Sequence, residues 1–274
     1  MSKSADSDDC LDSAIVASED LVAVWRSAGL SEGDTVLLHS SVSRTMQLQR
    51  SSDQSFSLTN LLDTFISAVG PYGTLLLPTF NFSFCEGLEY DCRITPSMMG
   101  ALTETARLDS RFLRTKHPIY SFAVAGRRAS EFVALENRSA LADNGPFGLL
   151  RRLRGKIAVL DLDDQNSMTM YHHIEEVMNV DYRYLKSFTG RYIDMSGCAE
   201  QRTFDLFVWD EVRNVRTDVN RAGDLLWSRG LYNGQRPCQG SGLRVINAQE
   251  MFLAIAEVIS TGRAGDYLYS IGPQ

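Results

Sequence analysis

Glu32-Gly33-Asp34-Thr35-Val36-Leu37-Leu38-His39-Ser40-Ser41 is the stretch of sequence that decides the fold. Its first three residues predict a turn, and residues 35–39 form a short, continuous apolar run with no alternation of polar side chains. Runs of this kind are typical of a strand that is buried on both faces, inside a sheet covered by helices. Ser40 and Ser41 then follow at the end of that strand.

The same pattern recurs along the chain, between segments with helical spacing of apolar residues. Further strands are predicted at 74–78, 119–124 and 157–162, and helices at 14–28, 61–69, 98–106, 149–153, 167–177 and 248–259. Residues 185–218 look rich in strands. This order predicts a single α/β domain with a largely parallel central sheet, to which antiparallel strands are added late in the chain.

Composition and charge limit the class of protein. The 274 residues suffice for one large domain, and 44% hydrophobic with 22% charged residues is ordinary for a globular protein. A net charge of −7 argues against non-specific nucleic-acid binding and is compatible with a cationic amine as substrate. No apolar run approaches the roughly 20 residues that span a membrane, so we expect no membrane partner.

The N-terminal residues and the cysteines indicate where the protein is located. Residues 1–13 are rich in Ser and Asp and lack an apolar segment, which predicts a disordered acidic tail before a domain at 14–274. The five cysteines are widely spread, without a CxxC pair, so we expect reduced thiols in a cytoplasmic protein. A homodimer is compatible with the sequence, which leaves the oligomeric state open.

His172 is the histidine whose surroundings most favour chemistry. It follows a predicted strand and a polar turn, and the ligand crevice of open α/β sheets lies at the carboxyl ends of strands. Glu175 and Glu176 are three and four residues further on, hence on the same helical face. A carboxylate beside an imidazole orients it and raises its basicity, as a base acting on an amine nucleophile requires. The alternative is an ordinary surface salt bridge.

A metal site is the second interpretation of these residues. His172 and Glu176 are spaced i, i+4, but no third ligand is indicated and HExxH is absent, so we predict no metal. His117 and His39, taken alone, fit structural histidines as well as functional ones. The hydroxyls and amides at Ser40 and Ser41 offer a weak anion site. GxSxG, GxxxxGK[ST] and GxGxxG are all absent, which disfavours the common hydrolase and nucleotide-binding sites.

Five short motifs, in order along the chain, resemble the aminoglycoside 3-N-acetyltransferase family. They are an HSS motif at 39–41, a PTF motif at 78–80, an MGxLTE helix at 99–104, an HPxxSF motif at 117–122 and a TxxHxxE segment at 169–175. The resemblance implies the antibiotic acetyltransferase fold rather than the GNAT fold, and acetyl-CoA as acyl donor. It makes His172 the general base and Glu175 its orienter. It implies direct attack of the amine on the thioester, with an oxyanion held by amides near Ser40 and Ser41.

The resemblance also implies which residues line the two clefts. For acetyl-CoA these are His39, Ser40, Ser41, Thr79, Phe80, His117 and Ser121, and for the acceptor Asp163, Asp164, Asn166 and Glu176. The turn before the TxxHxxE segment departs from the family pattern, because Asn166 stands where the family has an Asp. Residues 81–86 and the Glu175-Glu176 pair look more like those of biosynthetic relatives, so we expect a biosynthetic enzyme that acetylates an amino sugar or a natural-product amine. The alternatives are a resistance enzyme acting on aminoglycosides, and a relative with other acyl, hydrolytic or binding function.

Overall fold

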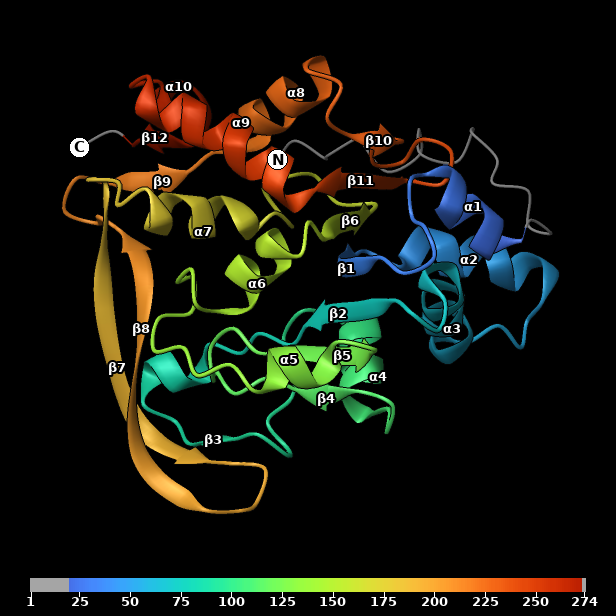
Figure 1. Ribbon diagram of the computed structural model, residues 1–274, viewed down its shortest axis with the longest axis horizontal. Helices are drawn as coiled ribbons and strands as arrows, with labels where there is room; N and C mark the ends of the chain where they lie inside the picture. Colours follow the sequence, from blue (N-terminus) through green and yellow to red (C-terminus); the bar gives the residue numbers. More distant parts are fainter. Residues whose placement is uncertain (1–19, 273–274) are drawn as a thin grey trace, which may run out of the picture.

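A mixed sheet of seven strands forms the centre of the molecule in the computed structural model, which describes residues 20–272 (Figure 1). The strands, in the spatial order β10-β11-β6-β1-β2-β5-β4, are β10 (Asn233–Gly234), β11 (Leu243–Asn247), β6 (Lys156–Leu160), β1 (Thr35–Ser40), β2 (Thr74–Pro78), β5 (Phe122–Gly126) and β4 (Leu113–Arg114). β1 is parallel to both of its neighbours, β6 and β2. The other neighbouring pairs are antiparallel. The predicted α/β domain is confirmed, with its parallel pairing confined to the three central strands.

Helices cover both faces of this sheet, as the two-sided burial of β1 requires. Val36 and Leu38 pack in the core on one face, whereas Leu37 between them packs in the core on the other. The first core contains side chains from α1 (Leu21–Ser27), α2 (Ser43–Ser52), α3 (Leu58–Val69) and α4 (Ala101–Leu108). The second contains side chains from α5 (Ala129–Val133), α6 (Pro146–Arg152), α7 (Met170–Val177), α8 (Asn220–Ser228) and α9 (Ala248–Ser260).

A long hairpin projects from one end of the sheet (Figure 1). It consists of β7 (Arg183–Ile193) and β8 (Ala199–Trp209), paired antiparallel along their whole length, with β3 (Tyr90–Asp91) added parallel to β7. A small separate core lies beside η1 (Ser83–Glu86) and contains Phe84, Tyr90, Cys92, Ile119, Tyr192 and Phe204. The short strands β9 (Val215–Thr217) and β12 (Tyr269–Ile271) pair near α10 (Ala264–Tyr267). The strand-rich region expected at 185–218 is thus this hairpin and β9.

Some predicted boundaries shift, for local reasons. The predicted strand at 119–124 begins later, at Phe122, because the amides of Ile119 and Tyr120 both donate to Nδ1 of His117 and hold a turn there. Of the helix predicted at 14–28, only α1 lies within the described residues, and the tail predicted at 1–13 lies outside them. The largely polar helix α2 was not predicted.

The cysteine expectation needs one correction. Cys85, Cys92 and Cys198 are free thiols, but Cys238 is disulfide-bonded, so the prediction that all five are reduced is wrong for that residue. Across residues 20–272, no helix is both long enough and apolar enough to cross a membrane. The same residues contain no group of three or more His, Cys, Asp or Glu side chains able to hold a metal ion.

Candidate active site

A cavity of about 160 Å³ lies where β6, β1 and β2 end at their carboxyl edge. His39 comes from the end of β1, and Phe80 follows the end of β2. The loop after β6 and the first turn of α7 supply much of the remaining wall. The lining residues are His39, Phe80, Phe82, Met99, Tyr120, Asp164, Gln165, Asn166, Ser167, Met168, Thr169, His172, Thr217 and Val219.

The loop between β6 and α7 carries His172 to this cavity. It begins at Asp161, whose backbone is left-handed (φ 48°) and whose carboxylate accepts from Nε of Arg44 at 3.0 Å. Asp163 then accepts from the backbone amide of Asn166 at 2.9 Å, and Ser167 donates to the carbonyl of Asp163. These bonds fold the polar turn tightly enough for α7 to begin at Met170.

His172 is one part of a buried polar cluster. Its Nδ1 lies 2.9 Å from Oε2 of Glu175, and the Glu175 side chain is only 1% exposed. The hydroxyl of Tyr182 donates to Oε1 of Glu175 at 3.0 Å. Arg183 places Nε 2.8 Å from the same Oε2 and its NH2 group 2.9 Å from Nδ1 of His172. With Nδ1 so occupied, Nε2 is the ring nitrogen available to a ligand in the cavity.

Burial and charge set the proton affinity of this imidazole. Burial lowers the pKa of His172 most, the positive charge of Arg183 lowers it further, and the hydrogen bond and charge of Glu175 raise it. The net effect is a pKa below the ordinary value of 6.5. The ring is therefore neutral at pH 7, which is the form that accepts a proton.

Another part of the cavity wall is aromatic and apolar. The ring of Phe80 contacts that of Tyr120 at 4.3 Å between centroids, and Phe82 meets Tyr120 edge-on at 5.9 Å. Burial raises the pKa of Tyr120 to about 12, so its hydroxyl stays protonated at neutral pH. Burial and Arg244 lower the pKa of His39 to about 3, so that this second histidine is neutral as well.

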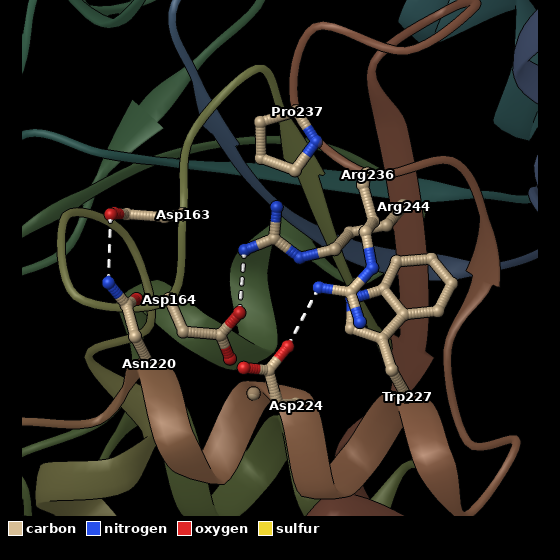
Figure 2. A pocket seen from close by; sticks show the side chains of 9 residues that line it. Asp163, Asp164, Asn220, Asp224, Trp227, Arg236, Pro237 and Arg244 are labelled. Carbon is tan, nitrogen blue, oxygen red and sulfur yellow. Dashed lines mark hydrogen bonds and ion pairs between the residues drawn. The ribbon is translucent and has the colours of Figure 1, made fainter.

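Asp164 lines both this cavity and a neighbouring pocket of about 230 Å³, which Figure 2 shows. Its carboxylate receives NH2 of Arg244 at 2.9 Å and the hydroxyls of Tyr171 and Tyr232, each at 2.7 Å. In the picture Asp164 points at Arg244, while Asp224 below them points at Arg236. The negative charge of Asp164 is thus balanced inside the protein and is not free for a substrate ammonium.

We compared the chain with models of known protein families. The family described as aminoglycoside 3-N-acetyltransferase matches residues 37–260, which is most of the chain. The chain belongs to the aminoglycoside 3-N-acetyltransferase family. It is an N-acetyltransferase by that membership, as the ordered motifs predicted. No curated relative matches the sequence.

Solved structures share the fold of this aminoglycoside 3-N-acetyltransferase family member. Aminoglycoside acetyltransferase AAC(3)-Xa is 19% identical, with a TM-score of 0.73 over 88% of this chain and 91% of its own. AAC-IIIb, solved as a binary complex with CoASH, is 17% identical, with a TM-score of 0.72 over 88% and 95%. AAC-VIa, bound to sisomicin, is 21% identical, with a TM-score of 0.71 over 89% and 97%. The predicted antibiotic acetyltransferase fold is thereby confirmed.

The structure places the predicted acetyl-CoA residues in two groups. His39 and Phe80 line the cavity, whereas Thr79, His117 and Ser121 are buried among internal partners. Thr79 and Ser121 share a hydrogen bond of 2.9 Å between their hydroxyls. The Ser41 amide donates to the Leu160 carbonyl at 2.8 Å, so it is not free to hold an oxyanion.

The predicted acceptor residues divide in the same way. Asp164 and Asn166 line the cavity, whereas Asp163 lines only the neighbouring pocket, where it accepts from Asn220 at 3.1 Å. Glu176 faces away and accepts from the hydroxyl of Ser139 at 2.8 Å. Burial raises the pKa of Glu176, which has no partner in the cavity.

Sequence reasoning missed several residues of the site. Tyr120, Thr217 and Val219 line the cavity, and Tyr182 and Arg183 hold Glu175 from behind. Thr217 and Val219 lie after the hairpin, more than 40 residues from His172, and no local pattern links them to it. Arg183 stands just before the strand-rich segment predicted at 185–218, and no local pattern links it to His172 either.

Proposed function

We propose that this chain transfers the acetyl group of acetyl-CoA to a primary amine of a small biosynthetic molecule, with His172 as general base. The observation that carries the proposal is the arrangement of His172: a neutral imidazole on the cavity wall, backed through Nδ1 by the buried carboxylate of Glu175. This arrangement lets Nε2 accept a proton from a ligand.

The donor follows from the family and from its relatives. AAC-IIIb has been solved with CoASH in the same fold. In this chain we assign the acetyl end of the donor to the cavity beside His172.

The reaction balances without a covalent acyl-enzyme. The acceptor amine arrives largely as ammonium, and Nε2 of His172 takes one proton from it. The freed lone pair attacks the thioester carbonyl carbon and a C–N bond forms. The nitrogen then loses a second proton to solvent, and the C–S bond breaks to give the neutral amide. The imidazolium returns its proton to the departing CoA thiolate, which leaves neutral His172 for the next turnover. Glu175 stabilises the imidazolium between these steps.

The chemistry of the cavity wall favours an acceptor with one amine and an apolar body. Asp164 is the carboxylate that lines the cavity, and its charge is balanced by Arg244. A polycationic aminoglycoside needs several free acceptor groups, because unpaired ammonium groups are costly to desolvate. Aromatic side chains at Phe80, Phe82 and Tyr120 instead suit an apolar substituent.

An acceptor panel tests this proposal by measuring release of CoA thiol. Aromatic and aliphatic monoamines are compared with an amino sugar and with sisomicin, the ligand of AAC-VIa. We expect a monoamine or a simple amino sugar to give a kcat/KM at least tenfold above that of sisomicin. Efficient acetylation of sisomicin would favour the alternative, a resistance enzyme. Absence of acetyl-CoA binding in calorimetry would contradict both acetyltransferase readings and favour a relative with other acyl, hydrolytic or binding function.

A further inference from the structure

Arg183, the first residue of β7, has contacts that the transfer chemistry above does not use. Its side chain is 4% exposed and is fixed from three directions. NH1 donates to the carbonyl of Phe207 at 3.2 Å, and NH2 donates to Oγ1 of Thr217 at 3.1 Å. The guanidinium carbon lies 5.4 Å from the centre of the Trp209 ring. A group held in this way keeps its place when other side chains move.

The same guanidinium contacts both members of the His172–Glu175 pair. Its NH2 group is 2.9 Å from Nδ1 of His172, and its Nε is 2.8 Å from Oε2 of Glu175. That carboxylate oxygen also lies 2.9 Å from Nδ1. Nδ1 therefore has a donor on one side and an acceptor on the other, at equal distance.

These two contacts cannot both be hydrogen bonds at the same time. A guanidinium only donates, so Arg183 bonds to Nδ1 when that nitrogen carries a lone pair and the ring proton sits on Nε2. A carboxylate only accepts, so Glu175 bonds to Nδ1 when that nitrogen carries the proton. The second tautomer leaves the lone pair on Nε2, facing the cavity, and is the one able to act as base.

We propose that Arg183 is a positioning residue that competes with Glu175 for Nδ1 of His172 and so sets which ring nitrogen carries the proton. The proposal rests on the function proposed above, in which Nε2 is the base. Arg183 favours the tautomer that is inactive as a base, and Glu175 favours the active one. The base is thus held in reserve in the free enzyme.

Thr217 connects this competition to the substrate. It lines the cavity and accepts from the NH2 group of Arg183 that contacts His172. The NH2 group carries two hydrogens, so it donates one to Thr217 and directs the other at Nδ1, and the Thr217 bond holds this donor in place against the ring. A ligand that breaks the bond to the Thr217 hydroxyl therefore loosens the donor at Nδ1 and acts on the tautomer of His172 without touching the ring.

Nitrogen-15 NMR of histidine-labelled protein tests the proposal directly, because protonated and unprotonated ring nitrogens have separate shifts. The chain has four histidines, and the His172 signals are assigned by their loss in His172→Gln. His173 is an internal reference: its Nδ1 lies 2.7 Å from the Leu141 carbonyl, which only accepts, so that its proton is on Nδ1.

Two variants are expected to move the His172 signals in the same direction, by different amounts. Arg183→Met removes the competing donor, so the proton moves to Nδ1 and the Nε2 signal shifts toward the unprotonated position. Thr217→Val, which keeps the side-chain shape, removes the bond that holds the NH2 group against Nδ1 and gives a smaller shift of Nε2 toward the unprotonated position. Arg183→Lys keeps the charge and serves if Arg183→Met fails to fold.

Identical His172 shifts in the wild type, Arg183→Met, Arg183→Lys and Thr217→Val would overturn the proposal. That failure is distinguishable from failure of the proposed function, since the shifts are read without turnover. If His172→Ala loses turnover but the His172 shifts are the same in the wild type and in the Arg183 and Thr217 variants, only the role of Arg183 is refuted. Full turnover in His172→Ala with the expected shifts refutes only the base assignment.

Discussion

Glu175→Gln is the substitution that separates charge from shape in the site. Glutamine keeps the side-chain length but removes the negative charge that faces His172 and Arg183. The guanidinium of Arg183, 4% exposed, then stays buried without a carboxylate. Removing one partner of a buried ion pair costs about 3–5 kcal/mol, so the free energy of unfolding measured in urea should fall by that amount.

The same change has a signed effect on the pH dependence. Glu175 raises the pKa of His172, while burial and Arg183 lower it, so removal of the Glu175 charge lowers that pKa further. The acid limb of the kcat/KM profile should therefore move to lower pH. Because the imidazolium also loses its stabilising carboxylate, kcat at pH 7 should fall by about 10²-fold, within the range for general bases.

Asp161→Asn is the matched control. Asp161 also forms a buried ion pair, with Arg44, and its side chain is 4% exposed, but it lies outside the cavity. Asparagine tolerates the left-handed backbone at this position. We expect a comparable loss of stability with an unchanged pH profile. The reasoning fails if Glu175→Gln keeps the wild-type kcat and acid limb, or if Asp161→Asn moves the acid limb equally.

Two further predictions concern stability and packing. Burial depresses the pKa values of three core histidines, to about 3 for His39 and about 4 for His117 and His173, and their Nε2 atoms are buried without hydrogen-bond partners. The unfolded chain therefore binds more protons than the folded protein below pH 6.5. As the pH falls from 6 to about 4, the free energy of unfolding should decrease by on the order of 1.4 kcal/mol per pH unit for each histidine. Urea titrations of His173→Gln should show a smaller dependence on pH. The Cβ of Gly223→Ala would lie 2.5 Å from Cγ of Asp164, so overpacking should lower the free energy of unfolding by about 1–3 kcal/mol. In the control Gly265→Ala the nearest atom lies at 3.6 Å, and we expect no such loss. Equal urea midpoints for the two variants would contradict this account.

The central sheet could be predicted from the sequence because its strands are buried on both faces. Residues 35–39 and 74–78 are uninterrupted apolar runs, and they form β1 and β2. The antiparallel pairing of β5 with β2 could not be predicted, because an apolar run has the same pattern in either direction. The polar α2 was missed since its sequence has few apolar residues to give a helical period.

The candidate site was predictable where its residues are neighbours in sequence. His172 and Glu175 are one helical turn apart, so spacing alone placed them on one face. Arg183 reaches the same pair from β7, and Thr217 of β9 bonds to Arg183, through tertiary contacts that no spacing encodes. Asp164 shows the converse, because a polar turn predicted a substrate contact while the fold uses that carboxylate to bind Arg244 and two tyrosines.

Turnover of His172→Ala tests the central claim, that this residue is the base for acetyl transfer. The rate of CoA-thiol release is measured with the best acceptor of the panel, alongside acetyl-CoA binding by calorimetry. His173→Gln, which alters the adjacent buried histidine on the other side of α7, is the control. We predict that His172→Ala loses about 10²–10⁴-fold in kcat while acetyl-CoA binding is retained, and that His173→Gln keeps turnover. Wild-type turnover in His172→Ala would contradict the account.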